Sequence, residues 1–315
     1  MKAVICTKYG SPEVLQLQDV EKPIPKHNEV LIKIIASNVT ASDCIVRSGK
    51  VSLLYWIPMR LALGFTRPRQ PILGQILSGI VEGLGKDVKD FEIGDKVFAH
   101  TFMKFGTYAE YICLPESSAL TNMPENSTFE EAASIPFGGT LALFFLKKAQ
   151  IKKGQNVLIY GASGAVGTAA VQIAKNYGAI VDGVCSSTNL KLVKALGADI
   201  VFDYTSKDFR LDDGKYDLIF DAVGKKKSKG FNYKNALMAN GKFLSVDNGN
   251  PGKKAVCKEN LNILKDLVES KRIKPVIDRK YSIEQIVEAH RYVDKGHKKG
   301  NVIISFSDDS ADVSH

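Results

Sequence analysis

Cysteine is scarce and scattered in this chain: five occur in 315 residues, and no two stand in a C-x-x-C pair. An odd number of distant cysteines fits neither a disulfide framework nor a zinc-finger pattern. We therefore expect a reducing compartment, the cytoplasm. The cysteines are Cys6, Cys44, Cys113, Cys185 and Cys257.

A long apolar run is also absent. The longest, VSLLYWIPMRLALGF at 51–65, is too short to span a bilayer and is interrupted by Pro58 and Arg60. We expect it to form a buried helix or a pocket wall, with a helix in a membrane interface as the alternative. The residues after Met1 lack the basic, apolar and small-residue segments of a leader, so we expect no signal peptide and no membrane partner.

The formal net charge is +9 at pH 7, and basic residues cluster at 224–230 and 295–300. Each cluster lies between glycines, which indicates solvated loops. Aromatic residues do not alternate with these lysines, as binding of a single nucleic-acid strand would require. We expect no nucleic-acid partner, because a surplus of this size serves solubility or attracts anions in general.

Two patterns of secondary structure follow one another along the chain. Up to about residue 100, short β-branched segments are broken by Gly, Pro and Asn, which predicts a compact, barrel-like β domain. From about residue 123, apolar strands alternate with amphipathic helices, which is typical of a parallel, doubly wound α/β sheet covered on both faces. Ser127 followed by Glu130 is a capping-box signal for the first helix of this part. Near its C-terminal end the chain returns to β-like segments.

Residues 157–172, VLIYGASGAVGTAAVQ, run from a strand through a glycine-rich turn into a helix. Small residues let the backbone approach a pyrophosphate, and the helix N-terminus offers free N–H groups and the positive end of its dipole. A second strand follows where a βαβ dinucleotide-binding unit needs it, although the spacing is G-x-x-G-x-x-G. A tight turn without a ligand is the alternative. The predicted contacts are Gly161, Ala162, Ser163, Gly164, Ala165, Val166 and Gly167.

The second strand of this unit ends without the acidic residue that usually binds the ribose diol of NAD. It reads Cys185, Ser186, Ser187, and Lys191 follows one helical turn later. Hydroxyls and a cation suit a 2′-phosphate, so the sequence favours NADP(H). Asp182 lies too early in the strand for that role and is expected on the sheet face. Ser186 and Ser187 could instead cap the next helix, and the two roles can coexist.

Motifs along nearly the whole chain now coincide. They are the opening 1–34, then ASNVTASDCIVRSG, PILGQILSGIVEGLGKDVKDFEIGDKVFA, the glycine loop GASGAVGTAAVQIAK, LGAD at 196–199, and the closing GNVIISF. In this order they resemble the medium-chain dehydrogenase/reductase superfamily, and more narrowly its zinc-free, quinone oxidoreductase-like branch. The resemblance covers about 1–306.

This resemblance implies an α/β fold of two domains. A GroES-like, β-barrel-type catalytic domain would occupy 1–122, and a doubly wound Rossmann domain with a parallel sheet would occupy 123–270. Residues 271–315 would return to the catalytic domain, and the active site would be the cleft between the domains. Members of this kind commonly dimerise through the edge of the Rossmann sheet, so we expect a homodimer.

The zinc ligands of other superfamily members are replaced here. The Cys of their first ligand motif corresponds to Thr40, and their Gly-His-Glu corresponds to Gly74-Gln75-Ile76. The segment IPFGGT, near their third ligand, contains neither Cys nor His, and the lobe with four cysteines is missing. A tetrahedral zinc site needs three or four converging ligands, so we expect no metal.

Without a Lewis acid, a simple ketone is a hard acceptor at neutral pH, whereas a quinone or a conjugated C=C–C=O needs only hydrogen-bond donors for its developing negative oxygen. The resemblance therefore implies an NADPH-dependent, zinc-independent oxidoreductase that transfers hydride to a quinone or an α,β-unsaturated carbonyl compound. Two alternatives stay open. One is a metal-free alcohol or aldehyde dehydrogenase, and the other is a catalytically silent relative that binds NADPH or nucleic acid.

The candidate catalytic residues are Asn38, Thr40, Asp43 and Gln75. Thr40 is the expected donor to the substrate carbonyl, while Asp43 is expected to orient the backbone or Arg47 more than to move protons. Gln75 either donates a hydrogen bond into the site or satisfies a buried carbonyl.

Other residues follow from matched segments alone. Tyr55, Trp56 and Met59 are candidates for the wall of the substrate cavity, whereas Ile45 stands where better-known quinone oxidoreductases carry Tyr. The resemblance further implies cofactor contacts from Thr140, Tyr204, Val223, Gly224, Asp247, Asn248, Gly249 and Asn301.

Overall fold

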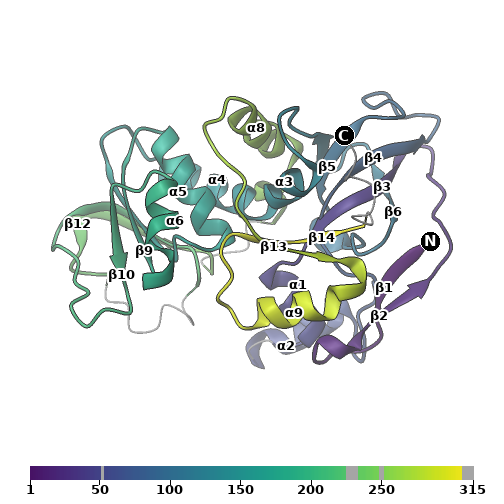
Figure 1. The fold of residues 1–315 in the computed structure, drawn as a ribbon, viewed down its shortest axis with the longest axis horizontal. Coiled ribbons are helices and arrows are strands. Elements are labelled where there is room, and N and C mark those ends of the chain that lie inside the picture. The colour runs from purple at the N-terminus through teal and green to yellow at the C-terminus, as the bar shows by residue number, and fades with distance from the viewer. Residues whose placement is uncertain (51–52, 225–232, 248–251, 307–315) are drawn as a thin grey trace, which may run out of the picture. The chain divides into compact units, whose positions relative to one another are not determined.

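We describe the fold from a computed structural model, which describes residues 1–50, 53–224, 233–247 and 252–306 (Figure 1). The chain divides into two compact units, and each is described by itself. The first unit holds Met1–Ser134, Cys257–Leu261 and Ile277–His315. The second unit holds Ile135–Val256 and Asn262–Val276.

A sheet of seven strands is the centre of the first unit, in the order β13-β14-β3-β4-β5-β7 with β6 paired to β3. Its strands are antiparallel neighbours, except that β13 and β14 are parallel. Two further strands form a separate antiparallel pair. The strands of this unit are β1 (Lys2–Cys6), β2 (Leu15–Asp19), β3 (Glu29–Asn38), β4 (Ile76–Leu84), β5 (Lys96–His100), β6 (Tyr111–Pro115), β7 (Leu120–Asn122), β13 (Ile277–Ser282) and β14 (Asn301–Ser305).

The sheet is held by apolar side chains that recur at every second position. Val30, Ile32 and Ile34 of β3 are at most 1% exposed and pack with Leu77 and Val81 of β4. This spacing of two puts them on one face of the strand. Full burial of each such side chain contributes about 1.5–3 kcal/mol to folding.

Four α-helices of the first unit pack around this sheet: α1 (Ala41–Ser48), α2 (Leu53–Leu63), α3 (Phe129–Ser134) and α9 (Ile286–Asp294). Short 3₁₀ helices are η1 (Pro12–Val14), η2 (Phe102–Lys104) and η4 (Ile283–Gln285). Helix α3 packs on β3, β4 and β14. Its residues therefore group with the first unit, whereas the sequence alone placed them with the second domain.

The N-terminus of α3 corrects one prediction. The capping box joins Thr128 and Glu131, because the amide of Thr128 donates to Glu131 over 2.9 Å and the amide of Glu131 donates to the Thr128 hydroxyl over 3.2 Å. The predicted pair, Ser127 and Glu130, was wrong by one residue. Glu130 instead receives a hydrogen bond from Nζ of Lys280 at 2.9 Å.

Helix α2 forms within the apolar run at 51–65, and the expectation that it is buried is confirmed for one face only. Met59 and Leu63 pack against the core of the first unit. Ile57 and Leu61 are 60% and 54% exposed. The side chains of Tyr55 and Trp56, predicted to line the substrate cavity, lie outside the described residues.

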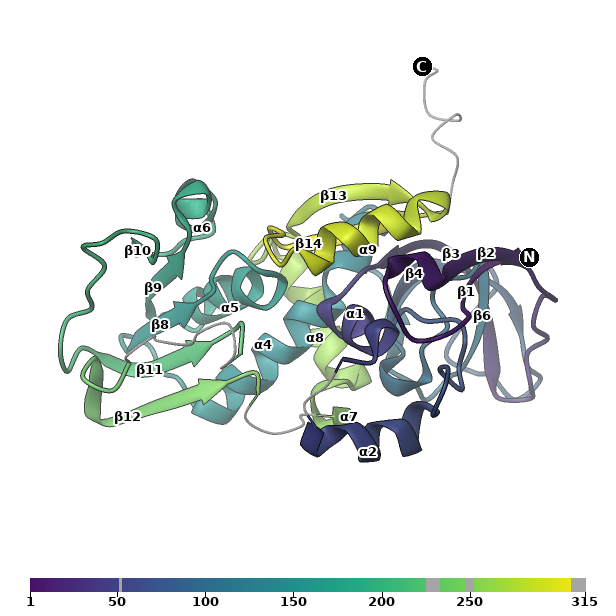
Figure 2. The same ribbon diagram turned by 90° about the horizontal axis from the view of Figure 1, so that it is seen from below.

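The second unit contains a sheet of five parallel strands in the order β10-β9-β8-β11-β12, which confirms the predicted parallel α/β sheet (Figure 2). Helix α5 packs on β8 and β9, and α6 packs on β9 and β10. The strands are β8 (Asn156–Tyr160), β9 (Ile180–Cys185), β10 (Ile200–Asp203), β11 (Tyr216–Asp221) and β12 (Leu237–Ser245). The helices of this part of the chain are α4 (Pro136–Ala149), α5 (Ala165–Asn176), η3 (Ser187–Asn189), α6 (Leu190–Ala195), α7 (Gly252–Ala255) and α8 (Lys258–Glu269).

Aromatic side chains from loops and strands also cover this sheet. Phe202, Phe209 and Tyr233 pack with the buried Tyr216, and the rings of Tyr233 and Phe243 stack at 3.7 Å. Within the described residues, no helix combines the length and the apolarity needed to cross a membrane.

Candidate functional site

The strand order of the second unit reverses between β8 and β11. The loops that leave the carboxyl ends of these two strands begin at Gly161 and Ala222, and they touch: a Cβ on Gly161 would lie 2.3 Å from Cγ1 of Val223. In open parallel sheets, ligands bind outside the carboxyl ends of the strands at such a reversal. The predicted glycine loop and the predicted Val223 therefore meet at the position where a dinucleotide binds in this type of sheet.

Each of the three glycines of the loop is required, or tolerated, for a different physical reason. Gly161 has a φ of +77°, which disfavours a side chain. A Cβ on Gly167 would lie 2.1 Å from the carbonyl oxygen of Gly161, so this glycine lets α5 approach β8 closely. A Cβ on Gly164 would meet only the Gly161 carbonyl oxygen, at 3.7 Å, and otherwise open space. The open side of the loop thus lies at Gly164.

Gly164 is also the N-cap of α5, and no side chain caps this helix. The first amide N–H groups of a helix have no partner within it and attract an anion. Within this segment, Ala162, Ala165 and Val166 are buried, while Ser163 is partly exposed. The residues present fit a dinucleotide pyrophosphate, which the N–H groups of 165–167 would hold, since the Gly164 amide donates to the Gly161 carbonyl oxygen.

Asn189 links the glycine loop to the end of β9, a connection that the sequence analysis missed. Its Nδ2 donates to Oγ of Ser163 at 3.2 Å and to Oγ of Ser186 at 3.1 Å. The Ser186 hydroxyl accepts this bond and makes no capping bond to η3. A polar residue directly after Ser186-Ser187-Thr188 was the available signal, but only the fold brings Ser163 to it.

Ser187 and Lys191 are exposed, and Ser186 is half-buried, at this strand end. Asp182 lies within β9, as predicted. Its carboxylate accepts a hydrogen bond from the Tyr216 hydroxyl at 2.8 Å and pairs with Nζ of Lys215 at 2.9 Å. Asp203 ends the neighbouring β10, and its carboxylate accepts hydrogen bonds from N and Oγ1 of Thr205. Those donors hold the pKa of Asp203 below its usual value.

A second residue that the sequence analysis missed is Asp221, at the carboxyl end of β11. Its Oδ1 accepts from the amides of Val223 and Gly224 at 3.1 and 3.0 Å, and its Oδ2 accepts from the Ser245 hydroxyl at 3.1 Å. Asp221 thereby fixes the loops after β11 and β12. A Cβ on Gly224 would lie 2.7 Å from Oδ2 of Asp247, so the predicted Gly224 and Asp247 adjoin.

The remaining residues predicted to contact the cofactor lie in different surroundings. Tyr204 is 46% exposed, and its ring centroid lies 6.3 Å from that of Tyr160. Thr140 is buried in α4, and its hydroxyl donates to the Pro136 carbonyl oxygen at 2.7 Å. Asn248 and Gly249 lie outside the described residues.

In the first unit, Thr40 and Asp43 form the capping box of α1. The amide and the hydroxyl of Thr40 both donate to Oδ2 of Asp43, at 2.9 and 2.6 Å, and the Asp43 amide donates to the Thr40 hydroxyl at 3.2 Å. Both side chains are buried. Burial raises the pKa of Asp43 to about 6, although the Thr40 hydroxyl and amide oppose that rise.

The predicted Asn38 and Asn301 lie side by side at the ends of β3 and β14. Nδ2 of Asn38 donates to Oδ1 of Asn301 at 3.0 Å and to the Ala133 carbonyl oxygen at 3.4 Å. Both asparagines are at most 3% exposed. Antiparallel pairing of Asn38 with Ile303 produces this neighbourhood, so residues far apart in the sequence share one polar contact.

Gln75 is 4% exposed, and its Nε2 donates to the carbonyl oxygen of Phe102 at 3.1 Å. That carbonyl belongs to a loop in which Phe102 and Phe105 have positive φ angles of 51° and 53°. Such angles are costly for large side chains and persist only where surrounding contacts hold them. Gln75 therefore satisfies a partly buried carbonyl in a strained turn, which is close to one of its two predicted roles.

Arg47 of α1 is buried as well, and so are Tyr108 and His290. Arg47 donates to Asp294 at 2.7 Å, and the rings of Tyr108 and His290 meet edge to face at 5.6 Å. Within the described residues, no three His, Cys, Asp or Glu side chains are grouped as metal ligands.

Comparison with known proteins supports the same family. Residues 26–125 match the family model described as alcohol dehydrogenase GroES-like domain, and residues 165–287 match that described as zinc-binding dehydrogenase. A tomato (Solanum lycopersicum) 2-methylene-furan-3-one reductase is 33% identical over 96% of this chain and 79% of its own length. The NADPH-dependent alkenal/one oxidoreductase, chloroplastic, of Arabidopsis thaliana is 31% identical over the same shares.

A solved structure of the quinone oxidoreductase from Coxiella burnetii superposes with a TM-score of 0.78 at 27% identity, covering 98% of this chain and 99% of that one. The glycine loop at the strand reversal fits a nicotinamide cofactor, which oxidoreductases of this kind use. The chain belongs to the medium-chain dehydrogenase/reductase superfamily, as an oxidoreductase of its quinone oxidoreductase-like branch.

Proposed function

We propose that the protein is an NADPH-dependent, zinc-independent reductase of quinones or α,β-unsaturated carbonyl compounds. Relatives named for furanone, alkenal/one and quinone substrates support this substrate class. The proposal concerns the class only, since these names describe other proteins.

The observation that carries the proposal is that Thr40 and Gln75 form hydrogen bonds with neighbouring groups of the protein. By the resemblance, these residues stand at the positions of two zinc ligands. The Thr40 hydroxyl bonds Asp43, and the Gln75 amide bonds the Phe102 carbonyl. Neither side chain is the thiolate or imidazole that usually holds a catalytic zinc. Polarisation of the substrate oxygen must then come from hydrogen-bond donors, which suffices for conjugated acceptors.

Bound NADPH would supply a hydride from its nicotinamide ring. Among the four candidate catalytic side chains, Gln75 retains a donor. Its amide nitrogen has two hydrogens, and the described residues provide one acceptor, the Phe102 carbonyl oxygen. Both hydrogens of the Asn38 amide have acceptors, and the Thr40 hydroxyl donates to Asp43. We therefore propose that the second N–H of Gln75 donates to the developing negative oxygen, whereas Thr40 and Asp43 stabilise the start of α1.

The preference for NADPH rests on Ser186, Ser187 and Lys191. Lys191 is exposed and forms no ion pair with a described acidic side chain, so its charge is available to a 2′-phosphate. A charge-assisted bond of this kind contributes about 1.5–3 kcal/mol.

The test is the loss of NADPH absorbance with enones, alkenals, quinones and simple ketones, with NADH in parallel and metal analysis of the same sample. We expect turnover with the conjugated acceptors, preference for NADPH and substoichiometric zinc. Turnover restricted to simple ketones, or stoichiometric zinc, would contradict the mechanism.

We also propose a homodimer. β12 pairs with β11 on one side, and the described residues provide no strand for its other side. Met238 on this strand is 43% exposed. Light scattering of the full chain would give a monomer mass if this proposal is wrong.

A further inference from the structure

Helix α2 is apolar on two opposite faces. Met59 and Leu63, four residues apart, pack against the core of the first unit. Ile57 and Leu61, also four residues apart, are 60% and 54% exposed on another face. A helix that is apolar all round normally has an apolar environment on every side. In this structure one face of α2 has such an environment and the other does not.

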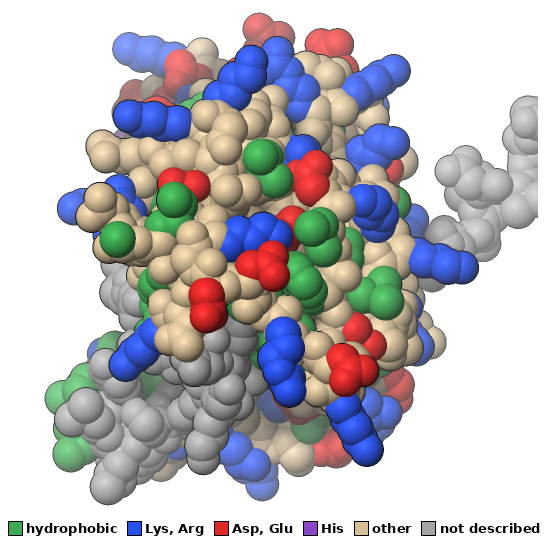
Figure 3. Space-filling view, turned by 90° about the vertical axis from the view of Figure 1, so that its left-hand side faces the viewer, with side chains coloured by type: hydrophobic (Ala, Val, Ile, Leu, Met, Phe, Trp, Pro, Cys, Tyr) green, Lys and Arg blue, Asp and Glu red, His purple; other side chains and the backbone are tan. Residues whose placement is uncertain are grey.

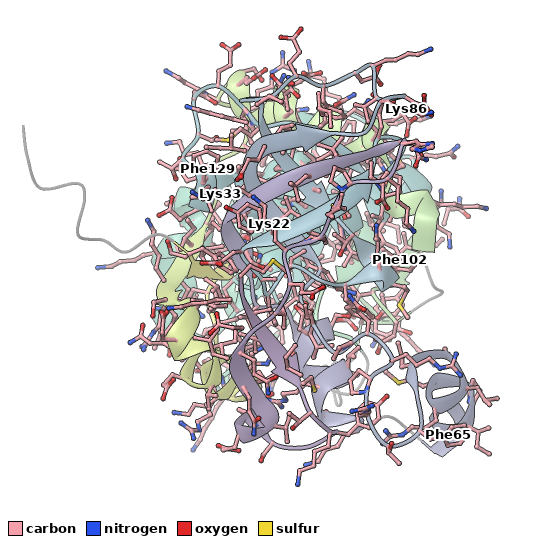
Figure 4. The ribbon with its side chains drawn as sticks, turned by 90° about the vertical axis from the view of Figure 1, so that its right-hand side faces the viewer. Lys22, Lys33, Phe65, Lys86, Phe102 and Phe129 are labelled. Carbon is pink, nitrogen blue, oxygen red and sulfur yellow. The ribbon has the colours of Figure 1, made fainter. Side chains whose placement is uncertain are left out.

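The exposed face continues into Phe65, which is 58% exposed. This end of the helix is firmly held, because the Tyr9 hydroxyl donates to the Gly64 carbonyl oxygen at 2.8 Å and Arg60 donates to the Phe65 carbonyl oxygen at 3.0 Å. The Arg60 guanidinium also lies 3.7 Å from the centre of the Tyr9 ring. Phe65 is thus presented by a fixed turn at the periphery of the unit (Figure 4).

The charges beside this apolar face have one sign. From residue 44 to residue 81 the chain contains no acidic residue and five basic ones. Arg47 and Arg60 have the partners given above, whereas Arg67 and Arg69 are exposed and form no ion pair with a described acidic side chain. Phe65, Arg67 and Arg69 line an open groove of about 530 Å³. We call Ile57, Leu61, Phe65, Arg67 and Arg69 the α2 patch.

The two most exposed apolar side chains elsewhere in the described part of the first unit stand alone. Ile24 and Ile93 of the first unit are 87% and 69% exposed, but they stand singly in loops with acidic and basic neighbours in the sequence. On the face of the molecule seen in Figure 3, apolar side chains stand as separate groups among residues of both charges. Single exposed apolar residues need no explanation, whereas a contiguous group marks an interaction site.

We propose that the α2 patch binds the surface of an anionic lipid bilayer. Ile57, Leu61 and Phe65 would enter the boundary between headgroups and acyl chains, and Arg67 and Arg69 would meet headgroup phosphates. The uniform positive charge favours an anionic bilayer over a second copy of this chain, which would bring the same arginines together. A helix of 11 residues is about 16 Å long, so it lies on the membrane and does not cross it.

This inference revises the expectation of no membrane partner and develops the interfacial alternative for 51–65. It is independent of the proposed function, since binding to lipid requires no turnover.

The experiment is flotation of the full chain with vesicles of phosphatidylcholine, either alone or with about one third phosphatidylserine. We expect the wild type to float with the anionic vesicles and to remain at the bottom with the neutral ones. The R67Q/R69Q variant should bind anionic vesicles about thirtyfold more weakly. The I57S/L61S/F65S variant should not float.

Control variants make changes of the same kind elsewhere in the first unit. K33Q/K86Q removes two charges at positions remote from Phe65 (Figure 4), and I24S/I93S removes two exposed apolar side chains. Both should float like the wild type, and all variants should unfold in urea as the wild type does. Failure of the wild type to float, or equal losses in patch and control variants, would overturn the proposal. It would also be overturned if the patch substitutions converted a dimer to a monomer with no vesicle binding by the wild type, because the patch would then join two copies.

Discussion

Oγ1 of Thr40 lies 2.6 Å from Oδ2 of Asp43, and the amide of Asp43 donates back to the same hydroxyl. This reciprocal contact begins α1 at the position where zinc-containing relatives, by the resemblance, carry a ligand. The hydroxyl hydrogen is committed to the carboxylate while Asp43 is ionised. A side chain expected to donate to substrate thus stabilises the helix that carries it.

The first prediction follows from this contact. Thr40→Val should lower the free energy of unfolding by about 0.5–2 kcal/mol, because the N-cap bond is lost, whereas Thr40→Ser should stay near the wild type. Turnover per folded enzyme should change little in both variants. Urea unfolding and steady-state kinetics provide the two measurements. A Thr40→Val enzyme with unchanged stability and a tenfold loss of kcat would instead assign the hydroxyl to the substrate.

The second prediction concerns Gln75. Gln75→Leu would leave the Phe102 carbonyl with only the long, 3.5 Å bond from the Phe105 amide, in a turn with positive φ angles. We expect a loss of about 1–3 kcal/mol in the free energy of unfolding. We also expect kcat to fall more than affinity for NADPH, because the second N–H of Gln75 is lost as well. A variant with wild-type kcat and lower stability would limit Gln75 to holding the turn.

The sequence predicts the cofactor loop well because its glycines act by lacking a side chain. Gly161 and Gly167 occupy places where a Cβ would clash. Only glycine lacks a Cβ, so the residue type alone indicates this requirement. Asp221 and Asn189 were missed because they act through partners that only the folded sheet brings near, such as Ser245 and Ser163. Their residue types alone are compatible with many loops.

Two local errors have equally physical causes. Ser127-Thr128 and Glu130-Glu131 allow two capping boxes one residue apart, and tertiary pairing of Glu130 with Lys280 accompanies the observed one. Composition predicted a buried α2 because it is mostly apolar, but composition does not say how many sides of a helix the core covers. Exposure of Ile57 and Leu61 could be learned only from packing.

The third prediction separates folding from cofactor binding within one loop. Gly167→Ala should destabilise the protein strongly, because its Cβ would lie 2.1 Å from a backbone oxygen. Gly164→Ala should fold like the wild type, since its Cβ meets open space and its φ is −80°. The added methyl group would occupy the side on which a pyrophosphate binds, so affinity for NADPH should fall about tenfold or more. Urea unfolding and fluorescence titration with NADPH check both statements. Equal NADPH affinity in Gly164→Ala would move the pyrophosphate away from this loop.

The fourth prediction concerns the choice between NADPH and NADH. Lys191→Ala should reduce kcat/KM for NADPH about tenfold and leave the value for NADH nearly unchanged, because only NADPH has a 2′-phosphate. Lys194→Ala is a matched control on the same helix, since Nζ of Lys194 donates to the Asp199 carbonyl oxygen at 2.6 Å. Equal effects of Lys191→Ala on both cofactors would remove Lys191 from the 2′-phosphate site.

The fifth prediction concerns stability in acid and rests on His290. This side chain is fully buried, its Nδ1 lies 3.5 Å from Sγ of Cys44, and its ring packs on Tyr108. Burial, helped by the charge of Arg47, lowers the pKa of His290 from 6.5 to about 3. Burial lowers the pKa of His100 to about 3 as well. Between these values the unfolded chain binds a proton at each histidine and the folded chain does not, so stability present above pH 6.5 is lost as the pH falls.

Asp43 acts in the opposite direction, because its pKa rises from 3.8 to about 6 and the folded state binds the extra proton in that window. From about pH 6 to pH 4, two histidine protons therefore oppose one carboxyl proton, and these three groups together lower the free energy of unfolding by about 1.4 kcal/mol per pH unit. His290→Gln removes one proton, so His100 and Asp43 should then nearly cancel and the variant's slope should be shallower by that amount. Urea unfolding at several pH values between 6.5 and 4 measures both slopes, and the exposed His27, substituted as His27→Gln, is the control. A slope in His290→Gln equal to that of the wild type would show that folding does not lower the pKa of His290.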